Sequence, residues 1–185
     1  NFENVTLVGV ISADQSLYSG DFRASERTFS LITQVVGRSG RGQKIGRAII
    51  QTFTPNNETI QQAARQDYED FYNSEIELRR LQNIPPFCDL LAVTASGTDE
   101  SRVIAACRFI KARIERAAAG RADTVILGPA PLPVVRVNNR YRYRVNICCT
   151  ADAQIRAIIA NTVIECSTDK SFKGISVYAD NDPND

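Results

Sequence analysis

The sequence predicts a short α/β unit followed by a small α+β domain. Residues 5–11 form an apolar run rich in β-branched side chains, which is typical of a buried strand. Strand, helix and strand patterns then alternate up to residue 53. After Pro85 and Pro86 the order is strand, helix, strand, strand, helix, strand. That order indicates a split βαβ sandwich, an antiparallel sheet with two helices on one face.

The first predicted unit opens with a strand and a helix. We expect the strand over 5–11 to be buried on both faces, as in a parallel sheet, with Asp14 beyond its carboxyl end. Asp21 is the expected N-cap of a helix over 22–36, because its side chain can accept from free N–H groups of the first turn. Gly37 is the expected stop of that helix.

A second strand and a long helix complete this unit. The strand is predicted over 46–53, and one helix is predicted over 58–81. Neither Pro85 nor Pro86 can continue a helix, and each disfavours helical structure just before it. The sequence therefore predicts a domain boundary there, with domains over 1–82 and 84–185.

The second domain has regular strand and helix signals. Asp99 is expected to cap a helix with an apolar stripe, and Asn138 and Asn139 are expected to form a hairpin turn because asparagine tolerates a positive φ. The predicted order is a strand over 89–96, the helix after Asp99, a short strand or a lead-in over 123–127, a loop over 128–131, strands over 134–137 and 140–149, a helix capped by Thr150 or Asp152, and a strand over 174–179.

Composition narrows the classes of function. The net charge is +1, so affinity for nucleic acid requires local basic patches. No apolar run reaches the roughly 20 residues of a membrane span. The sequence lacks methionine and begins within a strand pattern, which suggests a piece of a longer protein. The five cysteines never occur as C-x-x-C and there is no histidine, so we expect no metal site. We also expect reduced thiols and a cytosolic setting. Cys107 and Cys166 are expected to have packing roles.

Two arginines follow the end of the first predicted helix. Arg38 and Arg41 are separated by small residues in the stretch Gln34-Val-Val-Gly-Arg-Ser-Gly-Arg-Gly. Because a guanidinium is planar, permanently charged and bidentate, such a pair suits phosphate oxygens. The alternative is a solvated turn. The helix 22–36 leads directly into the motif, which argues against a disordered tail.

A second arginine cluster lies in the predicted strand 140–149. Arg140, Arg142 and Arg144 alternate with aromatic and aliphatic residues, so the three arginines share one face. We expect Arg136 on the neighbouring strand to join them. This basic face is suited to a phosphate backbone, and a solvated face is an equal alternative.

Eight segments of the sequence form an ordered set of motifs. They are residues 6–14, 21–29, 34–42, 50–53, 64–72, 85–87, 127–131 and 141–142. The first three resemble motifs five and six of the superfamily 2 helicases, and the glycine-arginine motif alone indicates only that superfamily. The whole ordered set resembles the PriA family of primosomal replication-restart helicases.

The resemblance implies a bacterial, cytoplasmic, ATP-dependent 3′ to 5′ DNA helicase. The family acts on forked and single-stranded DNA with single-strand-binding protein and other primosome proteins. This chain would hold the end of a RecA-like second motor lobe and a C-terminal domain. ATP and Mg²⁺ would serve the full-length protein, zinc would lie only in an upstream module, and this piece alone would be inactive. The resemblance implies no membrane partner.

The resemblance also implies roles for single residues. Arg41 would be the arginine finger, and Arg38 a γ-phosphate or relay contact. Gln34 and Gly37 belong to the same motif and would contact the nucleotide. Asp14 would also contact the nucleotide and couple it to DNA. The DNA-binding role of Arg136, Arg140, Arg142 and Arg144 rests on charge alone. Two rival functions remain open: a stand-alone nucleic-acid-binding module, and a docking domain for an acidic peptide, neither linked to ATP.

Overall fold

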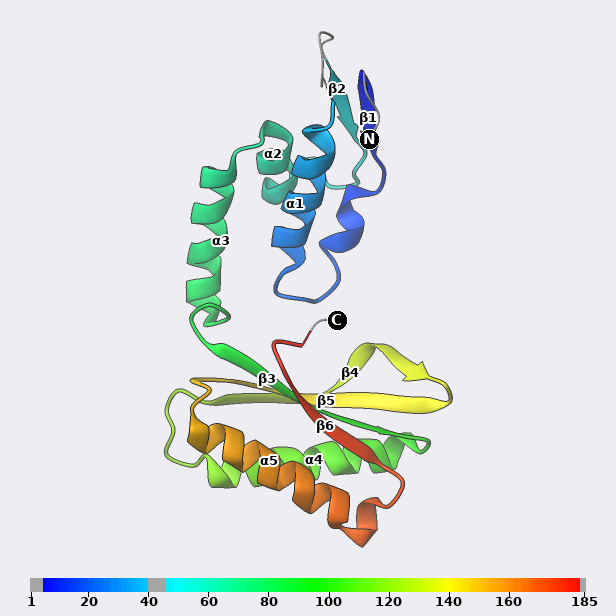
Figure 1. Ribbon diagram of the computed structural model, residues 1–185, viewed down its shortest axis with the longest axis vertical. Helices are drawn as coiled ribbons and strands as arrows, with labels where there is room; N and C mark the ends of the chain where they lie inside the picture. The colour runs from blue at the N-terminus through cyan, green and yellow to red at the C-terminus, as the bar shows by residue number, and fades with distance from the viewer. Residues whose placement is uncertain (1–4, 40–45, 184–185) are drawn as a thin grey trace. The chain divides into compact units, whose positions relative to one another are not determined.

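The computed structural model describes residues 5–39 and 46–183 (Figure 1). The chain divides into two compact units, Asn1–Gln82 and Asn83–Asp185. Over the described residues the fold is mixed, with five α-helices and two sheets. The first unit holds a two-stranded sheet and three helices, and the second a four-stranded sheet and two helices.

The first unit is built around a strand–helix–strand arrangement. Strands β1 (Leu7–Val10) and β2 (Arg47–Ile50) pair in parallel, and helix α1 (Ala24–Val36) lies between them in sequence. Val10 and Ile50 pack against the core formed with Phe29 and Ile32, whereas Leu7 is 60% exposed. The expectation of a strand buried on both faces is therefore wrong, because within the described residues α1 covers only one face of a two-stranded sheet.

The start of α1 differs from the prediction. The helix begins at Ala24, and Arg23 occupies the N-cap position without a capping side chain. Asp21 instead accepts a hydrogen bond from the backbone N–H of Arg23 at 2.9 Å and forms an ion pair with Arg27 at 2.7 Å. Asp21 thus shapes the turn before the helix. Gly37 follows the last helical residue, as predicted.

The single helix predicted over 58–81 is two helices. Helix α2 (Glu58–Arg65) ends where Gln66 adopts a left-handed φ of 57°, and α3 (Tyr68–Gln82) begins after Asp67. The Asp67 carboxylate accepts the backbone N–H of Asp70 at 3.1 Å, which restarts the helix as an N-cap does. The break lets Phe71 stack on Phe29 of α1 with ring centroids 4.2 Å apart. Leu81, near the end of α3, is 83% exposed.

The second unit has the predicted order of elements. Its sheet has the strand order β4-β5-β3-β6 with antiparallel neighbours, and two helices cover one face (Figure 1). This is the split βαβ sandwich expected from the sequence. The elements are β3 (Asp89–Gly97), α4 (Glu100–Ala117), β4 (Val125–Val137), β5 (Arg140–Cys149), α5 (Ala153–Thr168), the 3₁₀ turn η2 (Lys170–Phe172) and β6 (Ser176–Asn181). The first unit also contains a 3₁₀ turn, η1 (Ala13–Ser16).

The core of this unit lies between the helices and the sheet. The predicted α4 stripe is confirmed: Cys107, Ile110 and Ile114 are fully buried, as are Val145 and Ile147 of β5. Both helices start at capping aspartates. Asp99 accepts the N–H of Arg102 at 3.1 Å and Asp152 accepts the N–H of Ile155 at 2.9 Å.

Strand β4 is continuous where the sequence predicted two strands and a loop. It runs at the edge of the sheet, and its pairing with β5 shifts register between Leu127 and Ala130 and again between Pro131 and Arg136. An edge strand tolerates proline because one side of its backbone needs no ladder partner. The Asn138-Asn139 turn joining β4 and β5 has φ values of 48° and 64°, as predicted.

Two of the five cysteines are bonded to each other, which the sequence did not predict. Cys88, just before β3, forms a disulfide with Cys148 near the end of β5. The expectation of reduced thiols is therefore wrong for this pair, because strand pairing brings two cysteines 60 residues apart together. Cys107 and Cys166 are free and buried, which confirms their packing role.

Glycine 128 has a conformation and surroundings that exclude a side chain. Its φ is 111°, and an added Cβ would lie 2.8 Å from the carbonyl oxygen of Arg144. We expect Gly128→Ala to lower the free energy of unfolding of the second unit by roughly 3 kcal/mol or more, combining backbone strain with overpacking. Gly120→Ala is the control, because Gly120 also has a positive φ (96°) but open space around it. Urea titration should show the larger loss for Gly128→Ala, and equal losses would contradict the steric argument.

Candidate nucleotide-facing turn and arginine face

The turn after α1 carries part of the predicted phosphate-binding motif. Gln34, Gly37 and Arg38 are all exposed. The turn is held by backbone bonds from Arg38 to Val35 at 3.1 Å and from Ser39 to Val36 at 3.1 Å, and the Ser39 hydroxyl adds a bond to the same Val36 carbonyl at 2.8 Å. Within the described ranges no hydrogen bond or ion pair engages the Arg38 guanidinium. A fixed turn thus presents a solvent-accessible cation.

Arg41, the predicted arginine finger, lies in the stretch 40–45, outside the described residues. The relative placement of Arg38 and Arg41 therefore remains a prediction, as do the nucleotide roles of Gln34 and Gly37.

Asp14 is fully engaged in hydrogen bonds within the first unit. One carboxylate oxygen accepts from the hydroxyls of Thr52 and Thr54, each at 2.5 Å, and the other accepts from the backbone N–H of Phe53 at 2.8 Å. The two threonine hydroxyls hold the pKa of the Asp14 carboxyl far below its usual range. Because Asp14 is also buried, its role in the structure is to bind the segment after β2 to the segment after β1.

The structure does not bring all the predicted nucleotide-binding residues together. Asp14 lies at the carboxyl ends of β1 and β2, since the N–H of neighbouring Ala13 bonds to Gln51 just beyond β2. Arg38 lies past the far end of α1, whose 13 residues span about 20 Å at 1.5 Å per residue. Gln34, Gly37 and Arg38 share one stretch, and Asp14 is at the opposite end of the strand–helix–strand unit.

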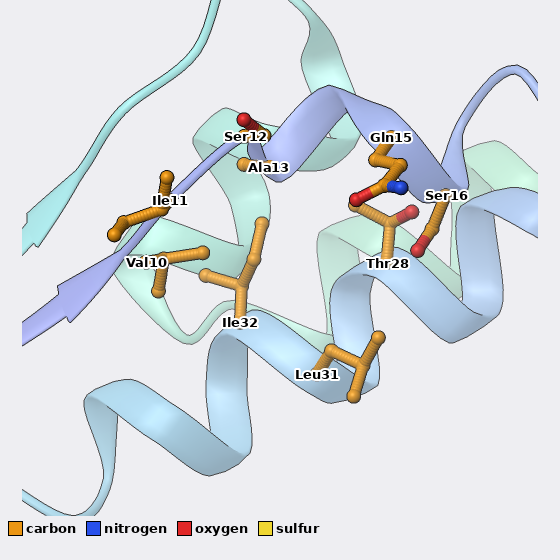
Figure 2. Close-up of a pocket in the computed structure, with 9 residues that line it drawn as sticks. All are labelled: Val10, Ile11, Ser12, Ala13, Gln15, Ser16, Thr28, Leu31 and Ile32. Carbon is orange, nitrogen blue, oxygen red and sulfur yellow. The ribbon is translucent and has the colours of Figure 1, made fainter.

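A pocket that the sequence did not predict lies beside Asp14, at the carboxyl end of β1. Its volume is about 190 Å³, and it lies between the chain leaving β1, η1 and one side of α1 (Figure 2). Its nine described lining residues include no charged side chain. This lining is poorly suited to a triphosphate, which requires cationic partners. The residues are Val10, Ile11, Ser12, Ala13, Gln15, Ser16, Thr28, Leu31 and Ile32.

The second unit confirms the three-arginine face of β5. Val145 and Ile147 point toward the helices and are buried, so the intervening residues lie on the opposite, helix-free face. Arg140 donates to the carbonyl of Ser96 at 2.7 Å and to the Ser176 hydroxyl at 3.0 Å. Arg142 donates twice to the carbonyl of Val134, at 2.8 and 3.2 Å.

These bonds orient the arginines without neutralising them. Carbonyl and hydroxyl oxygens accept hydrogen bonds but carry no formal charge, so Arg140 and Arg142 keep their positive charge in fixed positions. Arg144 is on the same face, paired in register with Thr94 of β3 and Ala130 of β4. We call Arg140, Arg142 and Arg144 the arginine face.

Arg136 does not join the arginine face, contrary to the sequence prediction. It is paired in register with Tyr141, and its guanidinium lies over the Tyr141 ring at 5.0 Å from the centroid. Cross-strand partners share a face, so Arg136 is on the side of Tyr141. The shift between Pro131 and Arg136 changes which β4 residues face which side, and alternation in the sequence alone does not reveal it.

Register also adds an aromatic residue to the arginine face. Tyr178 of β6 pairs with Thr94 of β3, which pairs in turn with Arg144, so Tyr178 lies on the same side of the sheet and is 47% exposed. Asp180, two residues further along β6, pairs with Ala92 and adds one negative charge to this side. Sequence reasoning missed both because they lie some 35 residues from the arginines and only strand pairing relates them.

The described residues contain neither a metal-binding cluster nor a membrane-spanning helix. No group of three or more His, Cys, Asp or Glu side chains among them could hold a metal ion. None of the helices in that part of the chain is both long and apolar enough to cross a bilayer.

A family model and the curated relatives agree on one family. A family model described as "Primosomal protein N C-terminal domain" matches residues 80–184. Replication restart protein PriA of Bacillus subtilis is 40% identical over 183 residues, covering 99% of this chain and 22% of that protein. PriA of Synechocystis is 39% identical over 140 residues (76% of this chain, 17% of that protein), and PriA of Chlamydia pneumoniae is 52% identical over 97 residues (52% and 13%).

The family match defines the class of the second unit, which is a primosomal protein N C-terminal domain. The chain belongs to the PriA family. It spans about a fifth of the length of the curated relatives that it matches. A solved hydantoinase/carbamoylase family amidase from Burkholderia ambifaria has a TM-score of 0.35 and 17% identity, covering 51% of this chain and 27% of that one, a likeness that supports no conclusion.

The Asp14 network should make stability depend on pH in a defined direction. Because the folded-state pKa is lowered from its ordinary value of 3.8, the network stabilises the first unit above pH 3.8 and loses this contribution as the pH falls below it. Asp14→Asn should therefore lower the free energy of unfolding at pH 7, and the difference from the parent should narrow at pH 3. Urea titration at both values measures this, with Glu69→Gln, at an exposed position of α3, as control. If the difference in free energy of unfolding between Asp14→Asn and the parent stays constant or grows toward pH 3, the stabilising role of the ionised Asp14 carboxylate is contradicted.

Proposed function

We propose that this chain is the C-terminal part of an ATP-dependent 3′ to 5′ DNA helicase that restarts replication in the bacterial cytoplasm. The observation that carries the proposal is the match to a replication restart protein over 99% of the chain, because it includes both units. The first unit would be the end of a RecA-like second motor lobe. Forked and single-stranded DNA, single-strand-binding protein and other primosome proteins are the proposed partners.

The proposed task of the first unit is to complete an ATP site formed mainly by the other motor lobe. Arg41 would stabilise the charge that develops on the γ-phosphate during cleavage, and Arg38 would orient that phosphate or Arg41. Supporting this, Arg38 projects from a hydrogen-bonded turn and is exposed. A guanidinium fixed in advance stabilises the transition state without the cost of reorganisation. ATP and Mg²⁺ would be bound by residues outside this chain.

The arginine face is the proposed DNA contact of the second unit. Arg140 and Arg142 are held by uncharged acceptors, so their orientation is set before binding and their charge remains available. Such contacts with phosphate oxygens give affinity independent of base sequence. An exposed tyrosine on the same face offers a surface on which an unpaired base can stack.

A docking site for an acidic peptide is the second candidate function of the arginine face. The favouring observation is that exposed apolar side chains share this side of the sheet with the arginines. Leu127 pairs in register with Asn146, on the helix-free side, and is 60% exposed. A peptide with carboxylates and an apolar residue would use both kinds of contact. Competition between single-stranded DNA and such a peptide distinguishes the two functions.

The arginine-finger assignment predicts a selective loss of hydrolysis. In the full-length protein, Arg41→Ala should reduce DNA-stimulated ATP hydrolysis by roughly 10³-fold or more and leave ATP binding nearly intact, because the guanidinium acts in the transition state. The 185-residue chain alone should show no ATPase activity. Arg65→Ala is the control, since Arg65 is an exposed arginine of the same unit, paired with Asp70. Near-parental hydrolysis by Arg41→Ala would refute the assignment.

The proposed DNA contact predicts a change in salt dependence. Replacing Arg142 and Arg144 together by glutamate should weaken single-stranded DNA binding by about tenfold or more, and the slope of log K against log salt should fall by about 1.4 to 1.8. The charge-matched control is Arg108→Glu with Arg116→Glu, because these exposed arginines of α4 lie on the helix side. Fluorescence anisotropy measures both, and circular dichroism verifies folding. Equal losses in the two double variants would show that only net charge matters.

A further inference from the structure

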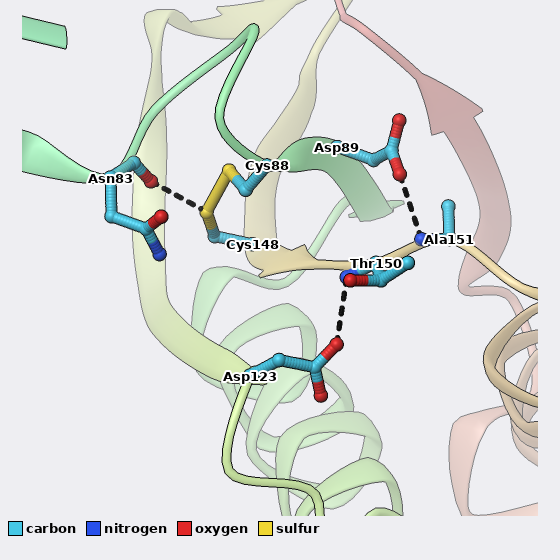
Figure 3. The surroundings of a disulfide bond; sticks show 7 residues. All are labelled: Asn83, Cys88, Asp89, Asp123, Cys148, Thr150 and Ala151. Carbon is cyan, nitrogen blue, oxygen red and sulfur yellow. Dashed lines mark hydrogen bonds between the residues drawn. A yellow bond between two sulfur atoms is a disulfide. The ribbon is translucent and has the colours of Figure 1, made fainter. Parts of the chain in front are cut away.

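Cys88 and Cys148 differ from the other three cysteines in their surroundings. Their side chains are only partly buried, and their Cα atoms lie 5.9 Å apart across the disulfide (Figure 3). Burial raises the pKa of Cys107 to about 12 and that of Cys166 to about 11, and it also raises the pKa of Cys149. Since the thiolate is the reactive form and access is needed, burial disfavours thiol chemistry at Cys107, Cys149 and Cys166 and leaves Cys88 and Cys148 as the accessible pair.

The two sulfurs are brought together by bonds that do not depend on the disulfide. Leu90 of β3 pairs in register with Cys148 of β5, so Cys88 precedes a strand already aligned with its partner. The Asp89 side chain accepts the N–H of Ala151 at 2.8 Å, and that of Asp123 accepts the N–H of Thr150 at 3.1 Å. Figure 3 shows these two carboxylates holding the chain just after Cys148. The pair can therefore open and close without loss of its alignment.

Cys148 has a partner available in the reduced state as well. Its sulfur lies 3.0 Å from the backbone carbonyl oxygen of Asn83. A sulfur in a disulfide carries no hydrogen, so this contact becomes an S–H···O hydrogen bond only after reduction. The thiol of Cys148 would then donate to the Asn83 carbonyl, in the chain that precedes Cys88.

The disulfide ends the segment that joins the two units. The first unit ends at Gln82, and residues 83–87 lead to Cys88 and then β3. Oxidation binds the end of this segment covalently to β5, and reduction leaves it attached by hydrogen bonds alone. We propose that Cys88 and Cys148 are a reversible dithiol–disulfide site that restrains the connecting segment in the oxidised state.

The chemistry is an exchange with a small disulfide such as oxidised glutathione. One protein thiolate attacks a sulfur of the small disulfide, forming a mixed disulfide and releasing one small thiolate. The second protein thiolate attacks the protein sulfur of that mixed disulfide and releases the other. One S–S bond breaks and one forms, two electrons pass from the protein dithiol to the small disulfide, and the two protein protons end on the two small thiols.

Thiol alkylation and hydrogen exchange test the proposal on the 185-residue chain. In glutathione buffers of increasing oxidised fraction, alkylation of Cys88 and Cys148 should disappear together, as read by mass spectrometry. Amide exchange in the peptide covering 83–88 should be about tenfold faster in the reduced chain than in the oxidised one, because the segment loses its covalent restraint. Exchange in the α4 core should be unchanged.

Single serine variants provide the controls. Cys88→Ser and Cys148→Ser should each show the fast exchange of the reduced chain in every buffer. Three results with the parent chain would each overturn the proposal: a persistent mixed disulfide with glutathione, a disulfide between two copies of the chain, or equal amide exchange in its oxidised and reduced forms.

Discussion

The second unit depends on the register of strand β5, which is paired on both sides. Its alternation places Val145 and Ile147 against the helices and Arg140, Arg142 and Arg144 on the opposite face. Because side chains in a strand alternate with a period of two, a slip of one residue would bury three guanidinium groups and expose the apolar residues. The cost of burying charged groups makes that register unfavourable. The core and the arginine face are therefore specified by the same constraint.

Strand β5 also carries both Cys148 and the arginine face. The end of β5 is held by the carboxylates of Asp89 and Asp123, and this arrangement positions Cys148 opposite Cys88. Near its other end, Arg140 and Arg142 bond to carbonyl groups of the two neighbouring strands. The basic face is thus a rigid surface, and its charge is not neutralised by those bonds. Arginines oriented in advance lower the ordering cost of contacts with a polyanion.

The first unit relies on a different constraint, the carboxylate of Asp14. It joins the segments that follow two parallel strands through donors that all come from Thr52, Phe53 and Thr54. This arrangement separates the functions at the two ends of α1. One end is an internal network with an uncharged pocket beside it, and the other presents the exposed Arg38. A single nucleotide contacted at both ends would have to span the length of the helix.

Patterns that depend on local chemistry were determined by the sequence itself. The α4 stripe, the caps Asp99 and Asp152, the asparagine turn and the alternation in β5 were predictable because helix and strand periodicity and capping act within a few residues. The predicted Asp21 cap failed, because the helix begins at Ala24. The tertiary structure alone decided the break at Gln66, the face occupied by Arg136, the place of Tyr178 and the pairing of Cys88 with Cys148. Packing of Phe71 on Phe29 favours that helix break, and a register shift moves Arg136. Strand pairing places Tyr178 beside Thr94, 84 positions earlier in the chain. None of these contacts leaves a periodic signal along the chain.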